Sequence, residues 1–82
     1  MKLGIIGLGY VGLPLCIQFG KSGAEVVGID VDEKKVESIN SGRSFIKHIL
    51  SSDIESLVKS GGLEATTEMS EASHCDGILV GV

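Results

Sequence analysis

The chain has 82 residues, which is enough for one small domain. Its composition, 43% hydrophobic and 22% charged, is that of a folded globular protein and excludes an intrinsically disordered chain. The formal net charge is −4, and the few Lys and Arg residues form no basic cluster. Because phosphate binding along a nucleic acid needs such a cluster, we expect no nucleic-acid partner.

The amino-terminal stretch is apolar but does not have the pattern of a secretory or lipoprotein signal. Glycines interrupt it repeatedly, and the bulky Leu15 stands before Cys16, where cleavage needs a small residue. No apolar run approaches the roughly 18 residues that a membrane-spanning helix needs. We therefore expect a cytoplasmic protein with no membrane partner.

The cysteines and histidines of the chain do not form an evident reactive site. Cys16 and Cys75 lie far apart in the sequence and lack metal-ligand spacing, so we interpret both as buried, reduced thiols of a cytosolic protein. His48 and His74 have no spacing typical of a metal site or a catalytic pair. An activated thiol at Cys75, next to His74, is the less favoured alternative, since neighbours in sequence rarely face each other.

The first predicted element is a buried strand over Lys2–Gly7, a short apolar run bounded by glycines. A helix is predicted over Tyr10–Lys21, because apolar residues recur at helical spacing from Val11 to Phe19. Pro14 falls within the first turns of this helix, where its missing N–H costs little. It therefore marks where the helix begins.

The middle of the chain continues this alternation of strand and helix. Glu25–Asp30 is predicted to form the second strand. Asp32 is then the N-cap of a helix that runs to about Ser41, with Gly42 as its C-terminal stop. The segment Arg43–Leu50 has no clean period, so we predict a loop.

The last part of the chain completes the pattern with shorter elements. These are a helix capped by Ser51 or Ser52 and ended by Gly61 and Gly62, a strand over Leu63–Thr67, one or two helical turns over Glu68–Ser73, and a strand over Gly77–Val82. Strands that alternate with crossovers of this length predict an α/β fold of the Rossmann type, with a parallel sheet in the order 3-2-1-4. This is the first half of a doubly wound dinucleotide-binding domain. The fourth strand would leave an apolar open edge, so we expect residues 1–82 to be the amino-terminal part of a longer domain.

A glycine-rich motif follows the first strand. Residues 7–12 read GLGYVG and match G-x-G-x-x-G between a strand and a helix. In this motif the first glycine permits a tight turn, the second lets the backbone approach a pyrophosphate, and the third allows the helix to pack closely on the sheet. The helix N-terminus offers N–H donors to the phosphates, above all near Tyr10 and Val11. The predicted cofactor-binding residues of the motif are Gly7, Leu8, Gly9, Tyr10, Val11 and Gly12.

Asp30 is a second, independent indication of a dinucleotide site. It ends the second predicted strand 18 residues after Gly12, near the spacing of about 20 expected for the acid that binds the adenosine ribose. A carboxylate there repels the 2′-phosphate of NADP, so NAD is the predicted cofactor. A surface aspartate at a strand end is the alternative interpretation, and Asp32 is the competing candidate for the role.

Residues 5–15, IIGLGYVGLPL, are more specific than the glycine motif alone. They resemble the amino terminus of the nucleotide-sugar 6-dehydrogenases, the family of UDP-glucose, GDP-mannose and UDP-N-acetylhexosamine dehydrogenases. The similarity continues through GID at 28–30, KVESINSG at 35–42, LEATT at 63–67 and DGILVGV at 76–82, and so covers essentially the whole chain.

The resemblance implies an NAD-dependent oxidoreductase that oxidises the 6-hydroxyl of a UDP sugar to a carboxylate with two NAD. It adds Lys35 to the site, because a basic residue five positions after the ribose-binding acid often contacts the cofactor in this family. Taken alone, Lys34 and Lys35 read as a solvated helix face. Residues 43–49, RSFIKHI, are similar to the loop of the UDP-N-acetylglucosamine and UDP-N-acetylmannosamine members, which favours a UDP-N-acetylhexosamine as substrate.

The same resemblance places the chemistry outside this chain. The catalytic cysteine of the family lies far downstream in a glycine-rich motif, and neither Cys16 nor Cys75 matches it. We therefore expect no catalytic residue and no metal ligand within 1–82, a nucleotide sugar bound by a further domain, and a homo-oligomeric parent enzyme. Two alternatives stay open: a β-hydroxyacid dehydrogenase, which typically carries Met in place of Val11, and a non-catalytic nucleotide-sensing module.

Overall fold

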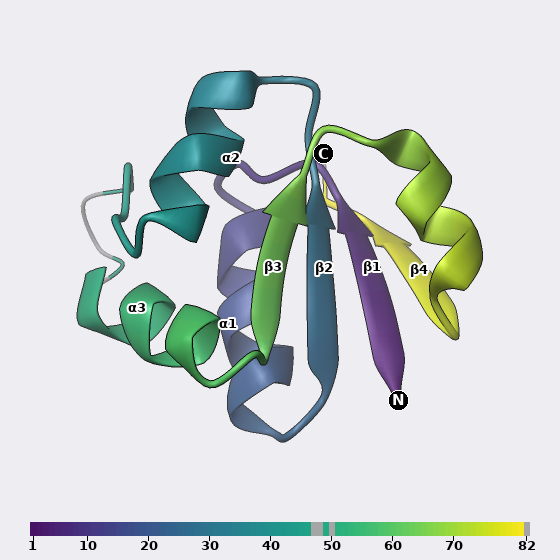
Figure 1. The fold of residues 1–82 in the computed structure, drawn as a ribbon, viewed down its shortest axis with the longest axis horizontal. Helices are drawn as coiled ribbons and strands as arrows, with labels where there is room; N and C mark the ends of the chain where they lie inside the picture. The colour runs from purple at the N-terminus through teal and green to yellow at the C-terminus, as the bar shows by residue number, and fades with distance from the viewer. Residues whose placement is uncertain (47–48, 50, 82) are drawn as a thin grey trace.

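A parallel sheet with strand order β3-β2-β1-β4 forms the centre of the fold in the computed structural model (Figure 1). The structure describes residues 1–46, 49 and 51–81. The strands are β1 (Lys2–Ile6), β2 (Glu25–Ile29), β3 (Leu63–Thr66) and β4 (Gly77–Val80). Both the predicted Rossmann-type order and the four strand positions are confirmed. Each strand ends one or two residues earlier than predicted, because the chain bends into its connection at the carboxyl edge of the sheet.

Four helical segments connect these strands within the described residues. They are α1 (Gly12–Lys21), α2 (Glu33–Asn40), α3 (Ser51–Lys59) and the short 3-10 helix η1 (Met69–His74). The prediction started the first helix too early, since Val11 is its N-cap and Tyr10 precedes it. No helix among the described residues is long and apolar enough to cross a membrane.

The predicted capping residues explain the limits of α2. The Asp32 side chain accepts a hydrogen bond from the Lys34 N–H at 2.9 Å, which confirms Asp32 as the N-cap. At the other end Gly42 has a φ of +77°, the left-handed conformation that ends helices. The loop that follows has neither helix nor strand where it is described, as predicted, and His48 lies outside the described residues.

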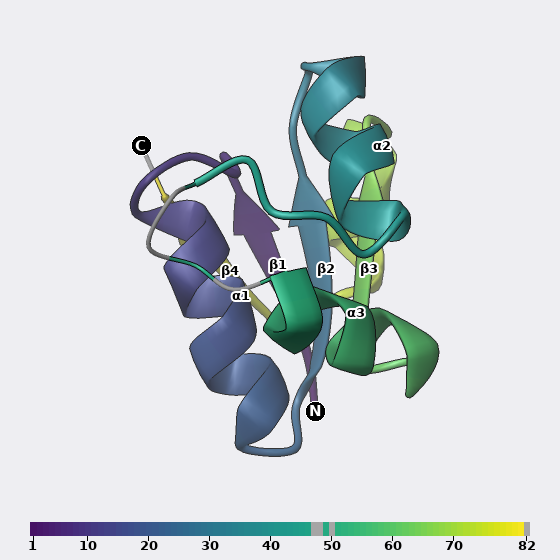
Figure 2. The ribbon, with the colours of Figure 1, turned by 90° about the vertical axis from the view of Figure 1, so that its left-hand side faces the viewer.

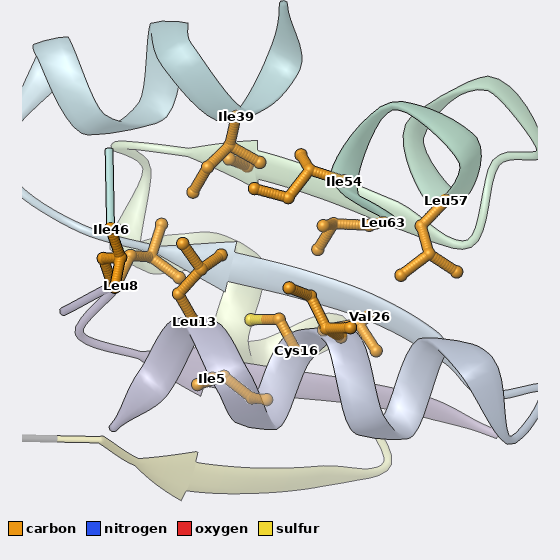
Figure 3. Close-up of a cluster of buried hydrophobic side chains, with 12 residues drawn as sticks. Ile5, Leu8, Leu13, Cys16, Val26, Ile39, Ile46, Ile54, Leu57 and Leu63 are labelled. Carbon is orange, nitrogen blue, oxygen red and sulfur yellow. The ribbon is translucent and has the colours of Figure 1, made fainter. Parts of the chain in front are cut away.

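The main core lies on one face of the sheet, beneath α1, α2 and α3. Side chains alternate between the two faces of a strand, so Ile5, Val26 and Leu63 point to the same side. Figure 3 shows these side chains between α1 and the pair α2 and α3. In the view of Figure 2, α3 lies between α1 and α2, and it packs against both.

The opposite face of the sheet has a thinner cover. Val27 and Ile29 point there and are buried, with η1 packed against β1 and β2. Cys75 follows η1, and its Sγ would lie 3.0 Å from a Cβ added at Gly4, so it packs over β1. The prediction that both cysteines are buried is correct for Cys16 and wrong for Cys75, which is half-buried because η1 buries no residue of its own.

The two edges of the sheet differ in how they are protected. At the β4 edge Ile78, Leu79 and Val80 are partly exposed, as predicted for an open apolar edge. At the β3 edge the Asn40 amide donates to the Ala65 carbonyl at 2.9 Å and accepts from the Ala65 N–H at 3.0 Å. The Asn40 side chain therefore satisfies the outward-facing N–H and carbonyl of Ala65 in β3, as a neighbouring strand would.

Candidate functional site

The glycine-rich loop of residues 7–12 leaves the carboxyl end of β1 and enters α1. Gly7 has a φ of +94°, which side chains with a Cβ rarely adopt, and its N–H donates to the Ile29 carbonyl of β2 at 2.8 Å. The chain thus turns sharply while it stays attached to the neighbouring strand. This is the turn that the sequence predicted for the first glycine of the motif.

The third glycine of the motif has no room for a side chain. A Cβ on Gly12 would collide with the carbonyl group of Gly7. Gly81, just after β4, packs against the same place, since its own Cβ would lie 2.6 Å from the Gly12 Cα. Gly7 after β1, Gly12 at the start of α1 and Gly81 after β4 therefore allow the start of α1 to pack closely on the sheet.

The second glycine of the motif faces open space instead. Among the residues that the structure describes, no atom lies within 4 Å of a Cβ added at Gly9. A cleft of about 210 Å³ opens beside it, lined by Gly9, Tyr10, Lys35, Phe45 and Ile46. The packing of this chain therefore does not require a glycine at position 9, in contrast to position 12.

The Asp30 carboxylate lies at the end of β2 and is hydrogen-bonded to the backbone on both sides. Its Oδ2 accepts from the Leu8 N–H at 2.8 Å, and its Oδ1 accepts from the Asp32 N–H at 2.9 Å. The Leu8 side chain is buried against β2, where a Cβ on Gly28 would lie 2.6 Å from its Cδ2. Asp30 and Leu8 together thus fasten the glycine-rich loop to β2.

These contacts lower the pKa of Asp30. Burial by itself raises the pKa of this carboxyl, but the backbone N–H groups of Asp32 and Leu8, together with the Lys35 charge, stabilise the ionised form more strongly. The net effect holds the pKa of Asp30 below its ordinary value. Asp30 is therefore a carboxylate at neutral pH, available as an acceptor at the edge of the loop.

Lys35 lies one turn into α2 and faces both the carboxylate and the cleft. Its Nζ is 5.9 Å from the centroid of the Phe45 ring, within the range of a cation–π contact. The Lys34 backbone serves the helix cap, whereas Lys35 lines the cleft beside Gly9 and Tyr10. All eight predicted site residues thus belong to one corner of the fold, around residues 7–12 and the end of β2.

The other candidate residues lie apart from this corner. His74 is exposed at the end of η1. The pKa of the Cys16 thiol is raised to about 12, because burial outweighs the opposing effect of a hydrogen bond to the backbone. Within residues 1–46, 49 and 51–81, no cluster of His, Cys, Asp and Glu could hold a metal ion. A larger hollow of about 480 Å³ lies between α1 and α3, and none of the predicted residues lines it.

Comparison with known proteins identifies this arrangement. The sequence model for the NAD binding domain of the UDP-glucose/GDP-mannose dehydrogenase family matches residues 1–82. The chain belongs to the UDP-glucose/GDP-mannose dehydrogenase family. NAD is accordingly the cofactor of this family domain, and the predicted resemblance is confirmed.

Individual members of the family agree with this assignment. The chain is 38% identical, over its full length, to UDP-N-acetyl-D-glucosamine 6-dehydrogenase of Salmonella typhi, and covers 18% of that protein. It is 37% identical to the NDP-N-acetyl-D-galactosaminuronic acid dehydrogenase of Ralstonia nicotianae, with 98% of this chain and 18% of the relative covered. The 1.55 Å ternary complex of GDP-mannose dehydrogenase from Pseudomonas aeruginosa superposes with a TM-score of 0.94 at 33% identity, over all of this chain and 19% of that one. The chain thus spans about a fifth of the family members that it matches.

Three residues of this corner were missed by the sequence analysis. Gly28 and Gly81 lie within or next to apolar strand patterns. A glycine in such a pattern indicates that another group approaches the backbone closely, and this signal would have identified both residues. Phe45 carried no such signal, because its place beside Lys35 depends on the path of a loop without periodicity.

Proposed function

We propose that the carboxyl edge of this sheet binds NAD through the glycine-rich loop and the end of β2. The observation that carries the proposal is the open space at Gly9, in a cleft that Lys35 also lines. The neighbouring Leu8 N–H holds the Asp30 carboxylate at the same loop. A glycine that packing does not require, at the point where the motif needs close approach, is what a pyrophosphate site needs. The proposed contacts come from these residues: Gly7, Leu8, Gly9, Tyr10, Val11, Gly12, Asp30 and Lys35.

The roles of these residues follow from their geometry. The Leu13 N–H already donates to the Gly9 carbonyl at 3.1 Å, so the donors for a phosphate belong to the loop before it, near Tyr10 and Val11. Asp30 accepts from the ribose hydroxyls with the lone pairs that Leu8 and Asp32 leave free. The Lys35 charge faces the anionic side of the cofactor. Leu8 acts indirectly, because its side chain is buried and its N–H holds Asp30.

For the whole protein, we propose oxidation of the 6-hydroxyl of a UDP-N-acetylhexosamine to a carboxylate. The family membership, the Salmonella typhi relative and the segment 43–49 support this substrate class. The cofactor would supply hydride acceptance, one NAD for each of the two oxidations, and water would supply the second carboxylate oxygen. Because the relatives are about five times as long, we place sugar binding and the reacting groups in the part of such enzymes that this chain does not match.

The test is a titration of the purified native protein with NAD, followed by turnover with different UDP sugars. We expect NAD binding and formation of two NADH for each UDP-N-acetylhexosamine, with slower turnover of UDP-glucose. Saturable NAD binding without NADH formation from any nucleotide sugar would refute the dehydrogenase and favour a nucleotide-sensing module. Absence of NAD binding would refute the site itself.

A further inference from the structure

Phe45 lies beside the proposed cofactor cleft without a role in the motif or in the main core. Its ring lines the cleft with Gly9 and Tyr10, and its side chain is 38% exposed. The Lys35 Nζ stands over this ring at 5.9 Å from the centroid. The exposed Phe45 ring next to the loop therefore contacts a cation, the Lys35 ammonium.

The backbone around Phe45 is held firmly on both sides. The Ser44 hydroxyl donates to the Ile46 carbonyl at 2.8 Å and accepts from the Ile46 N–H at 3.1 Å. The Ser44 N–H donates to the Ser51 Oγ at 2.9 Å, at the start of α3. Ile46 is 4% exposed and belongs to the core cluster. These contacts hold the backbone that carries the Phe45 ring, although the segment has no regular secondary structure where it is described.

A ring in this position reduces the number of rotamers that the Lys35 side chain samples. A lysine ammonium on a four-carbon stem samples many rotamers at a surface, and a ligand that needs it in one place must supply the ordering free energy. The face of an aromatic ring attracts the cation and reduces this freedom before the ligand arrives. The Asp30 carboxylate also attracts the Lys35 charge, which is one of the causes that lower the pKa of Asp30.

We propose that Phe45 is a positioning residue that holds the Lys35 ammonium beside the glycine-rich loop, where it meets an anionic phosphate of NAD. This inference rests on the proposed function of the loop. It assigns the ring to cofactor affinity through Lys35 and not to a stacking contact with the cofactor. Phe45 and Lys35 thus act as one unit on the outer wall of the cleft.

A double-mutant cycle on the native protein tests the proposal, with NAD affinity measured by calorimetry. Phe45→Leu removes the ring face, Phe45→Tyr keeps it, and Lys35→Met removes the charge. A cation–π contact at an exposed site contributes about 0.5 to 1 kcal/mol, which corresponds to a two- to fivefold loss of affinity in Phe45→Leu. We expect Phe45→Tyr to bind NAD within about twofold of wild type. Phe45→Met, which keeps an unbranched apolar side chain, is expected to match Phe45→Leu and replaces it should Leu destabilise the loop.

The decisive comparison is made in the Lys35→Met background. There the Phe45→Leu change is expected to cost no further affinity, since the ring no longer has a cation to hold. The same two- to fivefold loss with and without Lys35 would overturn the proposal and assign Phe45 to direct contact with the cofactor. Wild-type affinity in Phe45→Leu would also overturn it. If wild type binds no NAD, the proposed function fails and this inference with it, whereas the other two outcomes leave that function intact.

Discussion

The Leu8 N–H donates to the Asp30 Oδ2 at 2.8 Å, so the end of β2 holds the loop that leaves β1. The two residues are 22 positions apart in the sequence, and each belongs to a different part of the dinucleotide fingerprint. Their contact is a charge-assisted hydrogen bond to the backbone, among the stronger kinds in proteins. The glycine-rich loop and Asp30, the proposed ribose-binding acid, therefore form one preorganised unit.

Replacement of Asp30 by Ala is predicted to weaken NAD binding about ten- to a hundredfold, the range expected when hydrogen bonds to a charged group are lost. The overall fold should remain, because the carboxylate is not part of the core. Calorimetry gives the affinity and circular dichroism the fold. Asp32→Ala is the matched control, since it removes a helix cap worth about 1 kcal/mol of stability without touching the ribose contact. Collapse of the circular dichroism signal in Asp30→Ala would mark Asp30 as structural instead.

The protein is predicted to bind NAD more tightly than NADP. The Asp30 carboxylate stays ionised at neutral pH, and in its proposed role it would repel the 2′-phosphate of NADP. Parallel titrations with both cofactors measure the preference, and Asp30→Ala should reduce it. Equal or tighter NADP binding by the wild-type protein would contradict the role of Asp30.

The Asp30 contacts also predict a pH dependence of folding stability. The folded pKa of Asp30 is lowered, so its contribution is fully present above the unfolded value of about 3.9 and is lost as the pH falls through the folded value below it. Urea unfolding of wild type and Asp30→Asn between about pH 6 and pH 3 measures this difference. We expect wild type to be the more stable protein at the upper end and the difference to shrink toward the lower end. A difference that does not change with pH would contradict the assignment.

Gly9 and Gly12 differ in packing, so substitutions at these two positions are predicted to have different effects. Gly12→Ala places a Cβ into the Gly7 carbonyl and is expected to cost about 1–3 kcal/mol of unfolding free energy, as overpacked sites do. Gly9→Ala meets no protein atom and should leave thermal stability near wild type while it blocks NAD binding. Thermal unfolding and calorimetry of both variants separate these effects. Strong destabilisation by Gly9→Ala would show that this glycine serves the fold and not a ligand.

The two thiols are predicted to react at very different rates with an alkylating reagent at neutral pH. Cys16 is buried and its pKa is raised to about 12, whereas Cys75 is half-buried after η1. The native protein should therefore be labelled at Cys75 first, and Cys16 should react only after unfolding. Mass spectrometry of the labelled protein distinguishes the sites, with Cys75→Ser as the control that removes the fast reaction. Early labelling of Cys16 would contradict the packing of α1 on the sheet.

Local patterns in the sequence predicted the strands and the helix cap at Asp32, because these depend on neighbours within about one turn or one strand. The strand order followed from the rules for crossovers in parallel sheets. The Asn40 amide on Ala65 and the Gly81 contact with Gly12 were not predictable in this way. Both join segments that are distant in sequence, and only the packed sheet brings them together.

The position of β1 in the sheet has a consequence for the time course of folding. β1 leaves the ribosome before β4, which completes the second side of β1 in the sheet and brings Gly81 against Gly12. Parallel pairings of this kind are slow to form because long loops must close first. During synthesis the glycine-rich loop therefore emerges before Gly81, against which Gly12 packs. We conclude that the packing around residues 7–12 is complete in a nascent chain only after residues up to Gly81 have been made.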